Sequence, residues 1–170
     1  MRAGDKMIPV PVVSFVGYAN NGKTTFVIKV ISEMKRRGYK VGIIKHDVHG
    51  FEIDYPEKDT WRHAQAGADI VCISAANKVA YIRRVSEERA LDLLIQDMSD
   101  MDIVFTEGFK KENKPQIEVY RQQSGKEALG KRENLLAVVS DLQLYDEIPF
   151  FGFEDEVRLC DFLVQHFRIK

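Results

Sequence analysis

The residues from Gly17 to Thr24 constrain the fold of this chain more than any other feature. They read Gly-Tyr-Ala-Asn-Asn-Gly-Lys-Thr and fit the pattern GxxxxGK[ST] without a mismatch. Residues 10–16 before them form an apolar run, which is typical of a strand buried on both faces of a parallel sheet. Residues 23–37 after them carry their apolar side chains on one helical face and end at Gly38. The order strand, glycine-rich turn, helix predicts a phosphate-binding loop.

Each residue type in this motif has a physical reason. The two glycines let the backbone wrap closely around phosphate oxygens, and the N-terminus of the helix adds its positive dipole end. Lys23 can reach the β- and γ-phosphates, and the hydroxyl group of Thr24 can ligate Mg²⁺. A chance glycine-rich turn is the alternative, but the strand and the helix beside the motif argue against it. We therefore predict a nucleoside triphosphate site formed by Gly17, Tyr18, Ala19, Asn20, Asn21, Gly22, Lys23, Thr24 and Thr25.

Strands and helices alternate along the chain, and this predicts an α/β fold. Strands are expected at residues 41–45, 101–105, 117–120, 135–139 and 148–151, and helices at 59–67, 86–98 and 155–167. We predict a P-loop NTPase fold, a mostly parallel doubly wound sheet with helices on both faces. Residues 69–75 and 78–83 are expected to add an antiparallel β-hairpin. The chain is expected to be a single nucleotide-binding domain, 1–170, with a β-rich excursion around 69–83 and 116–133.

Two carboxylates are candidates for a magnesium site. Glu107 lies at the end of the strand predicted at 101–105, where P-loop folds place an acidic residue that holds Mg²⁺. Asp47 follows the second strand and is expected at the same edge of the sheet, where it can contact Mg²⁺ or orient a water molecule. Thr24, Glu107 and Asp47 are thus the predicted metal-binding residues, and Lys23 and Asp47 the predicted catalytic ones.

The residue that recognises the base is harder to identify. The segment Asn77-Lys78-Val79-Ala80 resembles the guanine-reading pattern [NT]KxD, but it lacks the aspartate and falls in the predicted hairpin. Asp141, after the strand at 135–139, is where such a carboxylate is expected. We predict that it contacts guanine, with a role as a helix cap or a turn former as the alternative.

Composition narrows the cellular context. The net charge of −1 gives no reason to expect a nucleic-acid partner, although residues 1–50 carry nine Lys and Arg against three Asp and Glu. The sequence has no apolar stretch long enough to span a membrane, and it is expected to be cytoplasmic with no membrane partner. Cys72 and Cys160 each lie in an apolar run, so both are expected to be buried, reduced thiols.

With these motifs identified, the chain resembles the MobB family of GTP-binding proteins of molybdenum cofactor biosynthesis. The resemblance runs from the first strand to about Tyr120 and is weaker beyond it. Four segments carry it: residues 17–25, 41–49 (Val-Gly-Ile-Ile-Lys-His-Asp-Val-His), 59–68 (Asp-Thr-Trp-Arg-His-Ala-Gln-Ala-Gly-Ala) and 105–110 (Phe-Thr-Glu-Gly-Phe-Lys).

The resemblance implies a homodimeric P-loop GTPase that uses GTP and Mg²⁺ and hydrolyses GTP slowly. It implies assistance to the MobA-type transferase that joins GMP to molybdopterin, with molybdopterin or its carrier enzymes as further partners. Carried over by position, Thr24 and Glu107 hold magnesium and Asp47 is a switch-like carboxylate. Arg62 and Lys110 are either phosphate or molybdopterin contacts or simply exposed charges.

Two other functions stay open at this point. A dethiobiotin-synthetase-like ligase or kinase of a small acid would use Lys45 beside the phosphates. A metal-delivery GTPase would use His46 and His49 as ligands, although two histidines alone do not define a metal site.

Overall fold

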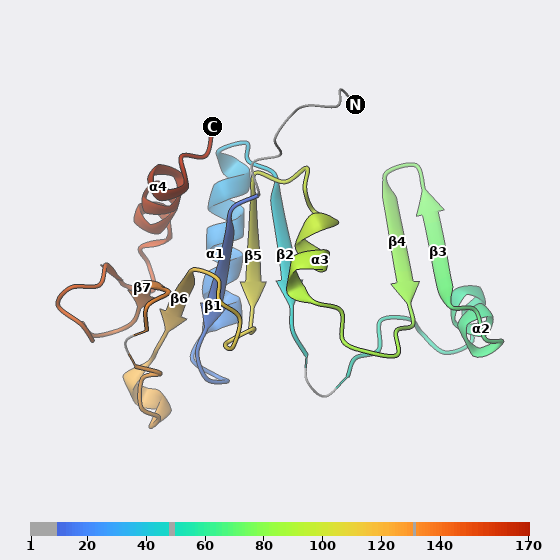
Figure 1. Ribbon diagram of the computed structural model, residues 1–170, viewed down its shortest axis with the longest axis horizontal. Helices are drawn as coiled ribbons and strands as arrows, with labels where there is room; N and C mark the ends of the chain where they lie inside the picture. The colour runs from blue at the N-terminus through green and yellow to red at the C-terminus, as the bar shows by residue number, and fades with distance from the viewer. Residues whose placement is uncertain (1–9, 48–49, 131) are drawn as a thin grey trace. The chain divides into compact units, whose positions relative to one another are not determined.

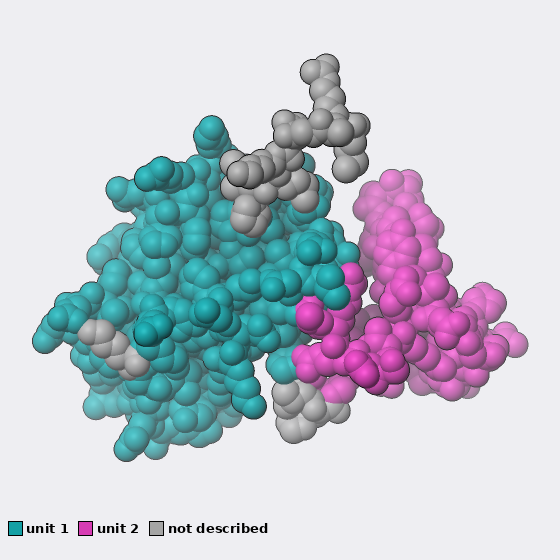
Figure 2. Space-filling view, in the orientation of Figure 1, with its two compact units in different colours: residues 1–46, 91–170 teal, residues 47–90 magenta. Residues whose placement is uncertain are grey.

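The computed structural model describes residues 10–47, 50–130 and 132–170 (Figure 1). The chain divides into two compact units, coloured separately in Figure 2. Unit 1 comprises residues 1–46 and 91–170, and unit 2 comprises residues 47–90. The predicted hairpin at 69–83 thus lies in a compact unit that is larger than the expected excursion.

Unit 1 contains a six-stranded sheet in the order β2-β5-β1-β6-β7-β8. Every pairing in this sheet is parallel. This confirms the predicted mostly parallel α/β sheet, in which the carboxyl ends of all strands lie at one edge. The strands are β1 (Val12–Val16), β2 (Val41–Lys45), β5 (Ile103–Glu107), β6 (Gln116–Val119), β7 (Leu135–Val139) and β8 (Phe150–Phe151).

Helices cover both faces of the sheet, as the sequence predicted. Helices α1 (Lys23–Arg36) and α4 (Glu156–Phe167) pack together, and their apolar residues join Val13 and Phe15 in one core. The shorter α3 (Leu91–Gln96) packs with Val12 and Val104 in a second core. Because successive side chains of a strand point to opposite faces, Val12 and Val13 place these two cores on opposite sides of β1.

Unit 2 contains α2 (Asp59–Gln65) and the antiparallel strands β3 (Ile70–Ala75) and β4 (Lys78–Arg83). Ala75 pairs with Lys78, which confirms the predicted hairpin and its turn. Most side chains of the two strands are exposed. Cys72 is among the exposed residues, so the expectation of a buried thiol is wrong there, whereas Cys160 is buried. A sheet of only two strands cannot bury both of its faces.

Two other expectations need correction. Residues 116–119 do not leave the sheet, because β6 pairs with β1 on one side and β7 on the other. Among the described residues 120–130, the short 3₁₀ helix η1 (Gln122–Ser124) is the one regular element, and the others are irregular. The helix expected from Ser86 begins at Leu91 instead. The order of strands in a sheet is a tertiary property, and a local pattern does not contain it.

The described part of the chain has no helix that combines the length and the apolar character needed to cross a bilayer.

An ionic cluster joins α1 to α4. Glu33, only 8% exposed, accepts hydrogen bonds from Nε of Arg36 and Nε of Arg37, both at 2.7 Å. Arg37 also donates to Oδ1 of Asp161 at 2.7 Å and to the carbonyl oxygen of Val157 at 3.0 Å, both on α4. Glu33 therefore orients Arg37 toward α4, and the basic end of α1 helps to join the two helices.

We predict that Glu33→Gln lowers the melting temperature at pH 7. Hydrogen bonds from Arg36 and Arg37 lower the pKa of Glu33 from 4.5 to about 2, so folding favours the ionised carboxylate. Its stabilising contribution is therefore present above pH 4.5 and is lost as the pH falls toward about 2. Thermal unfolding followed by circular dichroism across this range tests it, with the exposed Glu127→Gln as control. A deficit that persists at pH 2 would contradict the prediction.

Candidate nucleotide-binding site

The predicted phosphate loop joins β1 to α1 at the carboxyl edge of the sheet (Figure 1). Gly17 has a φ of 144°, and a Cβ atom there would lie 2.3 Å from the carbonyl oxygen of Val119 at the end of β6. Gly22 is the N-cap of α1 with a φ of 83°, again in the left-handed region that favours glycine. Both glycines of the motif are thus required by backbone geometry.

Asn21 fastens the loop to the same strand. Its Nδ2 donates to the carbonyl oxygen of Val119 at 3.3 Å, and the residue is only 1% exposed. The side chain of Asn21 therefore holds the backbone of the loop against the end of β6.

Lys23 reaches back over the loop. Its Nζ donates to the carbonyl oxygen of Tyr18 at 2.8 Å. Burial is the main cause that lowers the pKa of Lys23; the positive charges of Lys110 and Lys45 add to it, and Glu107 opposes it. A phosphate anion beside this ammonium group would favour its charged form, because opposite charges stabilise each other in a partly desolvated site.

The structure brings Thr24 and Glu107 together. Thr24 Oγ1 donates to Glu107 Oε1 at 2.5 Å, and Glu107 is the last residue of β5. Two oxygen ligands at adjacent positions around Mg²⁺ lie about 3 Å apart, since each Mg–O bond is about 2.0–2.1 Å. A hydroxyl and a carboxylate oxygen at this spacing suit Mg²⁺ with little rearrangement.

Further cations line the loop, and sequence reasoning missed two of them. Nζ of Lys110 lies 4.8 Å from the centre of the Tyr18 ring, and Nζ of Lys126 lies 4.9 Å from it. The guanidinium carbon of Arg121 lies 3.9 Å from the centre of the Phe153 ring. Arg121 and Lys126 belong to the polar segment after β6, and their position after a strand that ends at the ligand edge was the available signal.

Asp141 lies just beyond β7, at the same edge of the sheet. Its Oδ1 accepts the backbone N–H of Gln122 at 3.0 Å, so it is tied to η1. A cavity of about 360 Å³ lies between η1 and the phosphate loop, lined by Ala19, Asn20, Arg121, Gln123, Ser124 and Lys126. The phosphate loop and η1 thus border one hollow that contains the cations Arg121 and Lys126, and Asp141 contacts η1 without lining the hollow.

Other candidate residues lie elsewhere. Asp47 and Arg62 belong to unit 2, where Arg62 lies 4.0 Å from Asp59, and their predicted roles stay predictions. His46 stacks on Phe109 with ring centres 4.6 Å apart, whereas His49 lies outside the described residues. Among the residues that the structure describes, no group of three or more His, Cys, Asp or Glu side chains is arranged to hold a metal ion.

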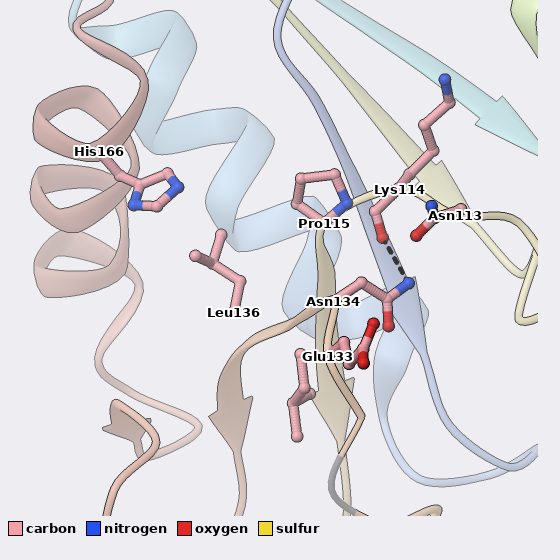
Figure 3. Close-up of a pocket in the computed structure, with 8 residues that line it drawn as sticks. Asn113, Lys114, Pro115, Glu133, Asn134, Leu136 and His166 are labelled. Atoms are coloured by element: carbon pink, nitrogen blue, oxygen red, sulfur yellow. Dashed lines mark hydrogen bonds between the residues drawn. The ribbon is translucent and has the colours of Figure 1, made fainter.

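A separate cavity of about 290 Å³ lies at the opposite end of β6 and β7 (Figure 3). Pro115, Leu135 and Leu136 form its apolar lining, with His166 of α4 at one side. The hydrogen bond drawn there runs from Nδ2 of Asn134 to the carbonyl oxygen of Lys114 at 2.8 Å. This bond joins the segment that precedes β7 to the segment that precedes β6, at the edge of the sheet away from the phosphate loop.

We predict that Gly17→Ala destabilises the protein more than Gly38→Ala does. Both glycines have positive φ, so each alanine costs about 1–3 kcal/mol of backbone strain. Only the Gly17 variant adds an overlap with a backbone carbonyl, since nothing lies within 4 Å of a Cβ at Gly38. Urea unfolding of the two variants measures the difference, and equal losses would contradict the close approach at Gly17.

Comparison with known proteins agrees with this geometry. The family model of MobB, described as molybdopterin guanine dinucleotide synthesis protein B, matches residues 12–141. The molybdopterin-guanine dinucleotide biosynthesis adapter protein of Escherichia coli (strain K12) is 32% identical over 96% of this chain and 95% of its own length. The adapter protein of Haemophilus influenzae is 31% identical over 91% and 88% of the two chains. A crystal structure described as molybdopterin-guanine biosynthesis protein B superposes with a TM-score of 0.70 at 29% identity, over 91% of this chain and 99% of that one.

Proposed function

The chain belongs to the MobB family, and from this premise we propose that it is a GTP-binding adapter in the biosynthesis of molybdopterin guanine dinucleotide. The observation that carries the proposal is the phosphate loop of Gly17–Thr25, with Lys23 folded over it and Thr24 hydrogen-bonded to Glu107. Relatives that align with nearly the whole chain are named as adapter proteins of this pathway.

In this proposal Thr24 and Glu107 would hold Mg²⁺, which would supply positive charge to neutralise the bound phosphates. Lys23 contacts the same phosphates, and the N–H groups of the loop surround them. Asp47 orients a water molecule, and GTP hydrolysis is slow. Phosphoryl transfer depends mainly on positioning and charge, so a partner or a second subunit can supply what accelerates it.

Asp141 is the proposed reader of guanine. Its carboxylate can accept from the N1 and N2 donors of the base, and adenine offers no such pair of donors. The hydrogen bond from Gln122 holds one carboxylate oxygen in place and fixes the orientation of the other. The proposal therefore favours GTP over ATP.

As an adapter, the chain would assist the MobA-type transferase that joins GMP to molybdopterin, and it would act as a homodimer. Lys110, already beside Tyr18 of the phosphate loop, is proposed to contact the phosphate group of the nucleotide or of molybdopterin. Arg62 in unit 2 is proposed to play the same part, and the enzymes that carry molybdopterin are further proposed partners.

Calorimetric titration with GTP and with ATP in Mg²⁺ tests nucleotide binding. We expect GTP to bind more tightly than ATP, and Lys23→Ala to weaken GTP at least about tenfold, because a hydrogen bond to a charged group contributes about 1.5–3 kcal/mol. Asp141→Asn should reduce the preference for GTP by about the same factor. Lys35→Ala, at the far end of the same helix, is the control. Absence of binding to the unmodified protein would contradict the proposal, and tighter binding of ATP would favour the small-acid ligase that uses Lys45.

The magnesium site has its own test. We expect GTP affinity to be higher in Mg²⁺ than in EDTA, and Thr24→Val to bring this ratio close to one because it removes the hydroxyl ligand. Thr24→Ser keeps the hydroxyl and should keep the ratio. If Thr24→Val leaves the ratio unchanged, Thr24 is not a magnesium ligand.

A further inference from the structure

Residues 121–129, which we call the wall segment, contact the proposed nucleotide site at three points. A Cβ atom added at Gly22 in the phosphate loop would lie 3.5 Å from a guanidinium nitrogen of Arg121. The backbone N–H of Gln122 donates to Asp141, and the ammonium group of Lys126 lies over the ring of Tyr18. The wall segment therefore determines the positions of Arg121 and Lys126, and it holds Asp141, which is proposed to recognise the base.

The wall segment has little regular structure to keep it in place. Its only helical turn is η1, which spans three residues and has no side-chain cap, and Gly125 directly after it has a φ of 66°. The beginning of the segment is fixed by β6, from which it emerges. A short irregular segment of this kind needs a second attachment to hold one conformation, because each ordered residue loses conformational entropy.

Glu118 of β6 provides that second attachment. Its Oε1 accepts the backbone N–H of Leu129 at 2.5 Å, which ties the far end of the wall segment to the sheet. Its Oε2 lies 3.7 Å from a guanidinium nitrogen of Arg132, three residues further on. The carboxylate thus holds the chain where it turns back from the site toward β7.

A carboxylate at this position is costly for the fold. Glu118 is 1% exposed, and its Oε2 makes no hydrogen bond among the described residues. Burial raises the pKa of Glu118, against the opposing effects of the Leu129 hydrogen bond and the charge of Arg132. Replacing a buried ion pair with apolar side chains of similar volume is often neutral or stabilising. Core packing alone therefore does not account for a glutamate here, whereas an acceptor for the Leu129 N–H does.

The same strand also holds the phosphate loop. Glu118 pairs in register with Val16, and the next residue, Val119, receives the Asn21 hydrogen bond and closely approaches Gly17. One strand therefore positions the phosphate loop through its backbone and the wall segment through the side chain of Glu118.

We propose that Glu118 is a positioning residue for nucleotide recognition: by accepting the Leu129 N–H it fixes the wall segment, and through Gln122 it fixes Asp141. This inference rests on the proposed function. It predicts that loss of the acceptor weakens the discrimination between GTP and ATP, because the carboxylate that reads the base is no longer held.

Three variants separate anchoring from packing. Glu118→Leu fills the same volume without an acceptor, Glu118→Gln keeps an acceptor without the charge, and Val138→Ala removes packing from the residue that pairs with Glu118 on β7. We expect Glu118→Leu to reduce the ratio of ATP to GTP dissociation constants at least about tenfold, as for the loss of one well-formed hydrogen bond to a charged group. Glu118→Gln should stay within about threefold of the unmodified protein. Val138→Ala should lower the melting temperature and leave the ratio unchanged.

Trypsin digestion tests directly whether the hydrogen bond between Glu118 and Leu129 holds the wall segment in place, since trypsin cleaves after Arg121 and Lys126 within that segment. Cleavage there should accelerate in Glu118→Leu and stay slow in Glu118→Gln and Val138→Ala. If Glu118→Leu does not fold, Leu129→Pro removes the same N–H from the loop side, with Leu129→Ala as its control. The digestion pattern tests the anchor even if the unmodified protein binds no nucleotide, an outcome that would overturn the proposed function. A folded Glu118→Leu or Leu129→Pro protein with unchanged ratio and cleavage, or a Glu118→Gln protein as impaired as Glu118→Leu, would overturn the inference.

Discussion

The carbonyl oxygen of Val119 is the point at which the sheet meets the phosphate loop. It accepts the side-chain amide of Asn21 at 3.3 Å and lies so close to Gly17 that only a residue without a Cβ atom fits. Because β6 lies between β1 and β7, this contact places the loop, Asp141 and the wall segment around a single strand. The proposed nucleotide site depends on that arrangement, since its groups come from segments far apart in the sequence.

Local features of the site could be predicted from the sequence. A strand, a glycine-rich loop and a helix are contiguous in the chain, so the motif at Gly17–Thr24 contains its own structural context. Glu107 could also be predicted, because the carboxyl ends of parallel strands meet at one edge of the sheet. The sequence predicts that Glu107 lies at the same edge of the sheet as Thr24. It does not predict the hydrogen bond between Thr24 Oγ1 and Glu107 Oε1 or the distance between these two atoms.

Other features could not be predicted because they depend on which segments become neighbours. Glu118 lies between two apolar residues, and this alternation is typical of a strand with one solvated face. It is buried because the chain returns over that face after residue 125, and nothing local in β6 indicates the return. The exposure of Cys72 has a different cause, since a sheet of two strands cannot bury both of its faces. For Arg121 and Lys126 the sequence indicates the edge of the sheet, because they follow a strand that ends there, but their contact with the phosphate loop depends on β6 lying next to β1.

The most direct test of the account is a crystal structure of the chain with a non-hydrolysable GTP analogue and Mg²⁺. We expect the phosphate groups to lie inside the loop of residues 17–25, within hydrogen-bonding distance of Lys23. We expect Mg²⁺ to be bound by Thr24 and to contact Glu107 directly or through water. We also expect the guanine base to lie beside Asp141. Phosphate groups bound away from this loop, or a magnesium ion that contacts neither Thr24 nor Glu107 directly or through water, would contradict the account.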